Sequence, residues 1–223
     1  MSSKSKTARE SVRVLIVDDH PTVREGLSHR VNAQHDMSVC GEAADVADAL
    51  QQIKVCQPDV VIVDIALKES DGLELIKAIK ARHKQVRALV HSMYDEAVYA
   101  QRCLSAGALG YVNKEAAADD VIQAIRNVYQ GRVHVSERVA SEILGRAAGG
   151  APSGEDPIST LTDRQLEIFR LIGQGKSAAH IAGQLHISVH TVETHRENIK
   201  RKLKVETVSE LTRLAALWEA DKR

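Results

Sequence analysis

Short apolar runs alternate with helical patterns along the first part of the chain. The clearest runs, 12–17 and 60–63, are nearly all valine, isoleucine and leucine, which is typical of strands buried on both faces of a parallel sheet. The expected strands are 12–17, 38–43, 59–64, 86–91 and 108–112, and the expected helices are 21–34, 46–54, 71–82, 95–105 and 117–129. This (βα)5 alternation predicts an α/β fold with right-handed crossovers and a doubly wound, five-stranded parallel sheet.

The pattern changes after residue 131. A short helix is expected at 136–147, and the following segment, 149–157, has the glycine, proline and serine content of a linker. We therefore expect a doubly wound domain at 11–131, a linker with a short helix at 132–157, and a smaller all-α domain at 158–223.

Beyond the linker the apolar positions recur only at helical spacing. Four helix starts can be recognised from capping boxes at Thr162/Gln165 and Thr207/Glu210 and from serines at 177 and 188. The short connection at 185–188, between the second and third of these helices, is what a helix-turn-helix requires.

Composition and charge narrow the function classes. The chain has 223 residues and a formal net charge of zero, so any surface for nucleic acid must be local. No apolar run is long enough to cross a membrane, and the polar, basic start lacks the apolar core of a signal peptide. Cys40, Cys56 and Cys103 lack metal-ligand spacing and suit reduced thiols. We expect a cytoplasmic protein that does not bind a membrane.

Acidic residues follow two of the expected strands. Asp18 and Asp19 come directly after the first strand, and Asp64 ends the third. Because the carboxyl ends of parallel strands meet at one edge of the sheet, these carboxylates should lie together as oxygen ligands for a divalent cation. Each acid alone could equally cap a helix or end a strand. Histidines show no metal-like grouping, and we expect surface or capping roles for His20, His91 and His134.

Further residues at the strand ends complete an ordered set. Asp18-Asp19, Asp64, Ser92 and Lys114 each lie at or just beyond an expected strand, and on these motifs residues 12–130 resemble a response-regulator receiver domain. Residues 158–219 resemble a LuxR-type helix-turn-helix, through the segments 161–165, 175–177, 181–182 and 191–196. Together the two domains are similar to the NarL/FixJ family of two-component transcription regulators.

The resemblance implies a phosphorylation site. Asp64 would accept a phosphoryl group from a sensor histidine kinase or phosphotransfer protein, and a carboxylate is a competent nucleophile for this transfer. The implied ligands of Mg²⁺ are Asp19, Asp64, Asp18 directly or through water, and the main-chain carbonyl of Ala66. Lys114 would supply a second positive charge to the phosphoryl group.

The resemblance also implies a switch. Ser92 would donate a hydrogen bond to a phosphate oxygen once Asp64 is modified, and Tyr111 is either a second switch residue or simply a packed ring. Two positions depart from the wider receiver pattern, because Lys68 and Glu115 stand where many receivers have proline. Lys68 would add a mobile charge near the pocket.

The third helix of the second domain has two faces. Val189, Val192, Ile199 and Leu203 are expected to form an inward apolar stripe. The resemblance implies that the other face reads the major groove of DNA, with base contacts from Glu193, Thr194 and Glu197 and phosphate contacts from Arg196, Lys200 and Lys202. The alternative is a solvated helix in which Glu197 pairs with Arg201.

The fourth helix carries many apolar positions for so small a domain. These are Val208, Leu211, Ala215 and Trp218 at helical spacing, with Leu214 and Leu217 beside them. The resemblance implies that this helix pairs two copies of the domain, as a homodimer, on a pseudo-palindromic DNA site. The alternative is that all six residues serve the core of one copy.

The prediction is a non-enzymatic, phosphorylation-controlled regulator that binds double-stranded DNA sequence-specifically and controls transcription. One rival is a phosphohydrolase with an aspartyl nucleophile, which normally needs a second acid two residues later. Ala66 occupies that position after Asp64. Another rival is a signalling protein whose helix-turn-helix binds protein instead of DNA.

Overall fold

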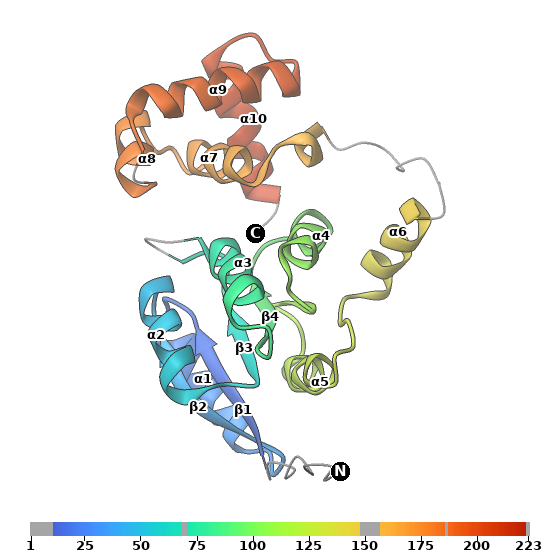
Figure 1. The fold of residues 1–223 in the computed structure, drawn as a ribbon. Helices are drawn as coiled ribbons and strands as arrows, with labels where there is room; N and C mark the ends of the chain where they lie inside the picture. Colours follow the sequence, from blue (N-terminus) through green and yellow to red (C-terminus); the bar gives the residue numbers. More distant parts are fainter. Residues whose placement is uncertain (1–10, 68–70, 148–156, 186, 222–223) are drawn as a thin grey trace, which may run out of the picture. The chain divides into compact units, whose positions relative to one another are not determined.

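The computed structural model describes residues 11–67, 71–147, 157–185 and 187–221, so the departure at Lys68 lies outside the described residues. The chain forms two compact units: the first consists of the residues up to Glu96 and of Cys103–Ser136, and the second consists of Ala97–Arg102 and of the residues from Glu137 onward. The first unit holds a parallel sheet with helices on both faces, and the second consists of helices (Figure 1).

The expected five-stranded parallel sheet is confirmed, with the strand order β2-β1-β3-β4-β5. The strands are β1 (Val12–Val17), β2 (Met37–Ala43), β3 (Val60–Val63), β4 (Arg87–Ser92) and β5 (Gly110–Asn113). Since β1 lies between β2 and β3, the strand order reverses direction at β1, which is the topological switch point of a doubly wound fold.

Helices follow each strand, as the alternation predicts. They are α1 (Pro21–Asn32), α2 (Val46–Cys56), α3 (Gly72–Arg82), α4 (Glu96–Ala106) and α5 (Ala118–Tyr129). α1 contacts α5, and α2 contacts α3; right-handed crossovers put these two pairs on opposite faces of the sheet. Gly107 and Gly131 follow α4 and α5 with φ of 122° and 77°, a conformation that ends a helix at little cost for glycine.

Alternate strand residues point into two apolar layers. One layer joins Val14, Ile16, Ile62 and Leu89 of the sheet to residues of α1 and α5, including Leu27, Val31, Ile125 and Val128. The intervening residues Leu15, Val17, Val61 and Val63 are fully buried as well. The central strands are therefore covered on both faces, which holds their carboxyl ends in fixed positions at one edge of the sheet.

A short segment after α5 adds to the edge of the sheet beside β5. His134 forms a parallel bridge with Gly110. Its backbone N–H donates to Leu109 O, and its carbonyl accepts from Tyr111 N, both at 2.9 Å. The ring is half-buried, with Nδ1 3.0 Å from Asn127 Nδ2, and burial lowers the pKa of His134. The expectation of a surface role for His134 is therefore wrong, because the chain past 131 still packs on the first unit.

The second unit contains the expected helix-turn-helix. Its elements are α6 (Glu137–Ala147), the 3-10 turn η1 (Pro157–Thr160), α7 (Asp163–Gly173), α8 (Ala178–Gln184), α9 (Val189–Leu203) and α10 (Val208–Asp221). Both predicted capping boxes are present, at Thr162/Gln165 and at Thr207/Glu210. Phe169 of α7 packs on Trp218 of α10, with ring centroids 5.6 Å apart.

The apolar stripe of α9 is shorter than predicted. Val192, Ile199 and Leu203 are buried as expected, but Val189 is 47% exposed. The inward assignment of Val189 is wrong because this residue is the first of α9, at the end of the stripe. Helical periodicity predicts a direction for a side chain but does not show whether the core extends to the helix end.

On α10 the apolar residues divide into two sets. Leu211, Ala215 and Trp218 are buried in the unit, whereas Val208 and Leu217 are 44% and 62% exposed. The interpretation in which all six apolar residues of this helix serve one core is therefore wrong. An exposed apolar set on α10 is what a pairing surface needs.

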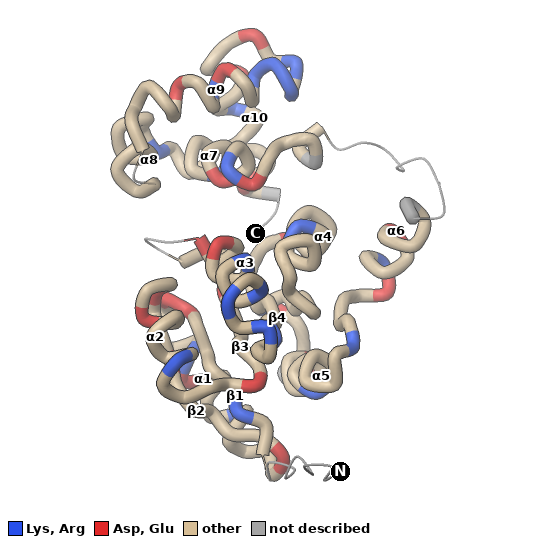
Figure 2. Tube along the Cα trace, in the orientation of Figure 1, with Lys and Arg blue, Asp and Glu red and all other residues tan. Residues whose placement is uncertain are grey.

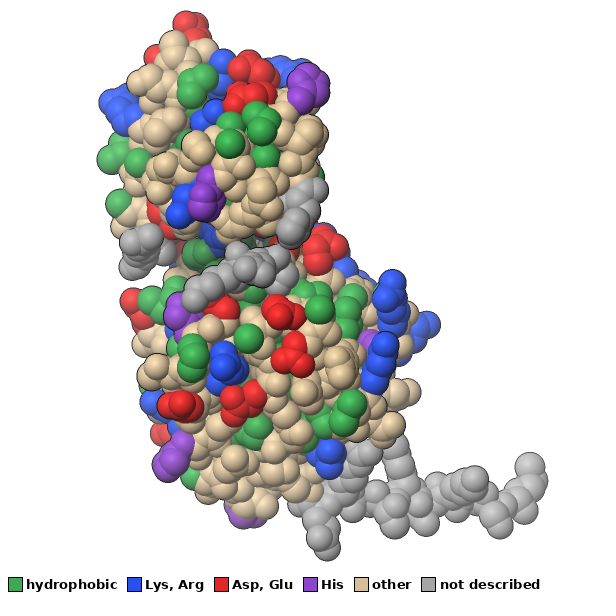
Figure 3. Space-filling model, turned by 90° about the vertical axis from the view of Figure 1, so that its left-hand side faces the viewer, with side chains coloured by type: hydrophobic (Ala, Val, Ile, Leu, Met, Phe, Trp, Pro, Cys, Tyr) green, Lys and Arg blue, Asp and Glu red, His purple; other side chains and the backbone are tan. Residues whose placement is uncertain are grey.

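Charge is mixed on both units. Figure 2 shows basic residues close together near the end of α9, where Lys200, Arg201 and Lys202 form the last turn. On the face seen in Figure 3, acidic, basic and apolar side chains are interspersed. No helix in the described ranges has the length and apolar character needed to span a membrane.

Candidate functional site

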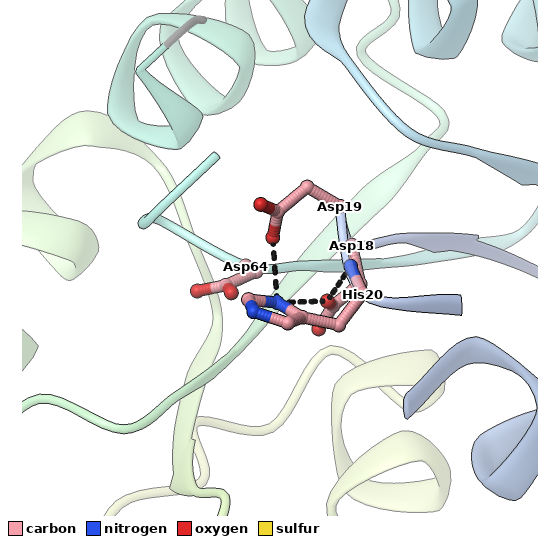
Figure 4. A group of neighbouring side chains, drawn as sticks. All are labelled: Asp18, Asp19, His20 and Asp64. Atoms are coloured by element: carbon pink, nitrogen blue, oxygen red, sulfur yellow. Dashed lines mark hydrogen bonds and ion pairs between the residues drawn. The ribbon is translucent and has the colours of Figure 1, made fainter. Parts of the chain in front are cut away.

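An acidic pocket lies at the carboxyl edge of the sheet. Asp18 and Asp19 directly follow β1, and Asp64 directly follows β3, which pairs with β1 through Val17 and Val63. Asp18 and Asp64 are only 2% and 3% exposed. Figure 4 shows the three carboxylates gathered with the ring of His20. The expectation that strand ends bring these acids together is confirmed.

Lys114, directly after β5, reaches the carboxylates of the pocket. Its backbone N–H donates to Ser92 O at 2.9 Å, continuing the β4–β5 ladder. Its Nζ donates to Asp18 Oδ2 at 2.5 Å and to Asp64 Oδ2 at 2.7 Å. Burial opposes the charge on Lys114, but the charge of Asp64 and these hydrogen bonds outweigh it and raise the pKa of Lys114. The lysine is thus held as a cation between the two buried carboxylates.

Both oxygens of the buried Asp64 carboxylate accept hydrogen bonds. Oδ1 accepts a hydrogen bond from Ala66 N at 2.9 Å, and Oδ2 accepts the one from Lys114. Burial raises the pKa of Asp64, while the charge of Lys114 acts in the opposite direction. A carboxylate that has lost most of its hydration is a better nucleophile than one in water. The buried side chain also has little rotational freedom to lose.

The pocket residues fit a divalent cation. Three carboxylates face one ammonium group, so the pocket keeps a formal charge of about two negative units that a dication would neutralise. Asp19 Oδ1 is buried yet accepts no hydrogen bond from the described residues. Ligand atoms of Asp18, Asp19, His20 and Asp64 all lie within 4.8 Å of one another. Oxygen donors in this number and spacing suit Mg²⁺.

The second group of predicted residues surrounds the loop between β4 and α4. Ser92 is fully buried, and its Oγ accepts from Tyr94 N at 3.4 Å. Tyr111 is 2% exposed and donates its hydroxyl to Tyr94 O at 2.8 Å. Asn113 Nδ2 donates to the same carbonyl at 3.1 Å. The backbone of the β4–α4 loop at Tyr94 is therefore fixed by hydrogen bonds to Ser92, Tyr111 and Asn113.

Two residues near the pocket were missed or misread from the sequence. Gly72, the first residue of α3, packs so closely that a Cβ there would lie 2.2 Å from Asp64 O. His20 lies on the surface as expected, with its side chain 60% exposed and without a side-chain cap on α1, but the expectation that it has no metal-like grouping is wrong. Its Nδ1 lies 2.8 Å from Asp19 Oδ1 and 3.4 Å from Asp18 Oδ1. The position of His20 directly after two acids was the available signal.

His91 also differs from its expected surface role. It lies in β4, is 8% exposed, and its Nδ1 has no hydrogen-bond partner among the described residues. Burial, together with the nearby charge of Lys114, lowers the pKa of His91 to about 4. The ring is therefore neutral at physiological pH and acts as part of the core.

The residues predicted to contact DNA lie on α9. Thr194 and Glu197 are exposed, and Glu193 is half-buried. Glu193 pairs with Arg196 at 2.9 Å, and Glu197 pairs with Lys200 at 3.0 Å. The expected alternative pairing of Glu197 with Arg201 is not the one found among the described residues, because the i,i+3 lysine takes its place.

Lys202 differs from the other basic residues of α9. Its Nζ donates to Thr160 O at 2.7 Å and to Gln165 Oε1 at 2.8 Å. These bonds tie the end of α9 to η1 and to the start of α7. Lys202 is thus engaged inside its own unit, whereas Arg196 and Lys200 pair with acids on the same helix face.

Known protein families match both halves of the chain. The family described as response regulator receiver domain matches residues 14–126, and the family of bacterial regulatory proteins, luxR family, matches residues 159–215. The chain is 35% identical over 209 residues to the oxygen regulatory protein NreC of Staphylococcus carnosus, covering 92% of this chain and 96% of that protein.

Solved structures agree with this assignment. RcsB from Salmonella enterica serovar Typhimurium, bound to the promoter P1flhDC with the phosphomimetic BeF3⁻, is similar with a TM-score of 0.71 and 25% identity. The match covers 92% of this chain and 98% of that one. A structure of two RcsB dimers bound to two parallel DNAs is similar with a TM-score of 0.67 at 25% identity, covering 91% of this chain and 97% of that one.

Receiver and LuxR-type motifs thus occupy the sheet unit and the helical unit in the expected order, and relatives match across almost the whole length. The chain belongs to the NarL/FixJ family of two-component response regulators, with a receiver domain followed by a LuxR-type DNA-binding domain.

Proposed function

We propose that Asp64 is the phosphoacceptor of this response regulator and that its phosphorylation by a partner histidine kinase controls DNA binding by the second domain. The observation that carries the proposal is the buried Asp64 carboxylate, which shares Lys114 with Asp18 in a pocket of excess negative charge. In this arrangement one carboxylate is the acceptor and the other acids are available to hold a cation.

Asp64 would act as the nucleophile in an in-line transfer. A carboxylate oxygen forms the new bond to phosphorus, and the bond from phosphorus to the nitrogen of a phosphohistidine breaks, with its electron pair returning to the imidazole. Ala66 N and Lys114 Nζ fix the orientation of the carboxylate, as the hydrogen bonds at 2.9 and 2.7 Å indicate. Lys114 then neutralises part of the charge on the bound phosphoryl group.

Asp18, Asp19, Asp64 and the main-chain carbonyl of Ala66 would hold Mg²⁺ in the pocket. Bound there, the cation supplies charge neutralisation for the phosphoryl oxygens. Removing one of the acids should therefore weaken phosphorylation even where Asp64 remains.

The switch would run through the β4–α4 loop. Phosphorylation places about −1.5 to −2 charge units at Asp64. Ser92 is the hydroxyl group at the end of the neighbouring strand, and its Oγ now accepts from Tyr94 N. Rotation of Ser92 toward the phosphate would change that contact and with it the carbonyl of Tyr94, on which Tyr111 and Asn113 depend.

The output would be sequence-specific DNA binding by α9. Glu193, Thr194 and Glu197 are proposed for base edges, and Arg196, Lys200 and Lys202 for phosphates. Arg196 and Lys200 would exchange glutamate partners for phosphates, and Lys202 would do so only by leaving Gln165 and Thr160. A phosphate contact from Lys202 would therefore cost two hydrogen bonds within the unit.

The exposed apolar residues of α10 would pair two copies on a pseudo-palindromic site. We propose domain limits of 11–131 and 158–223, with a linker at 132–157 whose first residues pack on the receiver. The protein would act as a cytoplasmic, non-enzymatic regulator. A phosphohydrolase remains disfavoured because Ala66 stands where its second acid would be.

The proposal is tested by incubating the protein with Mg²⁺ and a small phosphodonor and locating the acyl phosphate by mass spectrometry. We expect modification at Asp64 and none in Asp64→Asn. Modification that persists in Asp64→Asn would contradict the assignment. Selection from random duplexes should give one motif, with affinity that falls as salt rises and a motif altered in Glu193→Ala.

A further inference from the structure

His20 is the one nitrogen donor among the described residues of the acidic pocket that could share a cation with the carboxylates. Its Nδ1 lies 2.8 Å from Asp19 Oδ1 and 3.4 Å from Asp18 Oδ1, and Figure 4 shows the ring turned toward both. The side chain is 60% exposed and does not cap α1. Its orientation is therefore not explained by packing or by the helix start.

The contact between His20 and Asp19 needs a proton or a metal ion beside the two facing atoms. Asp19 Oδ1 is buried and accepts no hydrogen bond from the described residues, while an Nδ1 that carries no proton and a carboxylate oxygen at 2.8 Å would present lone pairs to each other. Either a proton on Nδ1, in the neutral or the charged ring, or a metal ion near both atoms removes this repulsion. Both possibilities make distinct predictions for metal binding.

The spacing of the ligand atoms fits a metal ion. Two neighbouring ligands of an octahedral ion at ~2.1 Å are about 3 Å apart. The separations of His20 Nδ1 from Asp19 and Asp18, 2.8 and 3.4 Å, bracket that value. The whole set of ligand atoms from the three acids and His20 lies within 4.8 Å.

We infer that His20 supplies a nitrogen ligand to a first-row transition-metal cation in this pocket, so that Mn²⁺, Co²⁺ or Zn²⁺ competes there with Mg²⁺. The inference rests on the proposed cation site formed by Asp18, Asp19 and Asp64. Imidazole favours these metals, whereas Mg²⁺ prefers oxygen ligands and keeps much of its water. An exposed ring at the rim of the pocket adds a ligand that discriminates between the two classes of cation.

The test compares Mg²⁺ and Co²⁺ binding to the full-length wild type, His20→Ala and a matched control, His29→Ala. His29 is an exposed histidine of α1 that lies outside the ligand group. Isothermal titration gives both dissociation constants, and the visible absorption of Co²⁺ reports on its ligands. We expect His20→Ala to weaken Co²⁺ at least about tenfold, to leave Mg²⁺ within about twofold, and to change the Co²⁺ spectrum. His29→Ala should change none of these.

Equal changes in Co²⁺ and Mg²⁺ affinity in His20→Ala would overturn the inference. Tighter binding of both metals would mean that the ring carries a proton and acts only as a competing charge, which also overturns it. These results would leave the Mg²⁺ pocket intact. By contrast, wild-type protein that binds neither metal, or Mg²⁺ affinity unaffected by Asp19→Asn, would overturn the proposed pocket itself.

Discussion

Replacing Lys114 by methionine removes the cation between two buried carboxylates while keeping an unbranched side chain. Lys114 is 9% exposed on its side chain, and its partners Asp18 and Asp64 are 2% and 3% exposed. Removing one partner from a buried ion pair typically costs about 3–5 kcal/mol, because the remaining charge has neither water nor a counterion. We expect the free energy of unfolding at pH 7 to fall by about that amount, or the Tm to fall by roughly 10 °C.

A matched control distinguishes the loss of a buried ion pair from the loss of a lysine charge at the surface. Lys77 pairs with Glu74 on the surface of α3 at 2.9 Å, with side-chain exposures of 42% and 65%. Lys77→Met should therefore cost no more than about 0.5 kcal/mol. The loss in Lys114→Met should shrink as the pH falls toward 5, since the unpaired carboxyls then take up protons in the folded protein and lose their buried charge.

Two optical probes distinguish the units in this experiment. Trp218 is the single tryptophan of the chain and is 8% exposed in the second unit, so its fluorescence follows that unit. Far-UV circular dichroism follows both units. The unfolding transition of Lys114→Met, followed by circular dichroism, should shift to lower temperature. A loss below about 1 kcal/mol, or one no larger than that of Lys77→Met, would refute the electrostatic reasoning.

Three further predictions follow from other residues. Burial lowers the pKa of His91 to about 4, so between pH 6.5 and 4 the unfolded chain takes up a proton at this residue and the folded chain does not. The free energy of unfolding should therefore fall as the pH decreases through this range, by at most about 1.4 kcal/mol per pH unit. A series of melting curves should show a flatter fall in His91→Gln, and an equal fall would mean that another group is responsible. Gly72→Ala should lower the free energy of unfolding in urea by about 1–3 kcal/mol and slow phosphorylation of Asp64, because the new Cβ would lie 2.2 Å from the carbonyl oxygen of Asp64. An unchanged urea midpoint would contradict the close packing. Leu217→Glu should leave the Tm nearly unchanged, since Leu217 is 62% exposed, but weaken dimerisation and DNA binding in sedimentation and titration experiments; unaffected DNA binding would exclude this residue from the pairing surface.

The pocket could be predicted from sequence because backbone topology alone determines it. Once 12–17 and 60–63 are neighbouring parallel strands, Asp18 and Asp64 must follow at the same edge of the sheet. Lys114 follows β5 at that edge for the same reason. No side-chain detail is needed for any of these three positions.

The remaining features depend on three-dimensional detail that periodicity does not contain. The direction of the His20 ring depends on the backbone at the start of α1, which the position of His20 after two acids does not determine. The exposure of Val189 depends on where the core ends along α9. The packing of Gly72 against Asp64 joins two segments whose contact is visible only in the folded chain.

The bridge between His134 and Gly110 bears on how the receiver can be isolated. β5 is the last strand of the sheet, and the backbone of His134 pairs with the N–H of Tyr111 and the carbonyl of Leu109 along its outer side. A fragment cut at 131 would expose these groups as an open sheet edge, which favours self-association of the fragment. A fragment that continues through Ser136 keeps the edge covered, and it should be the more soluble and monomeric of the two.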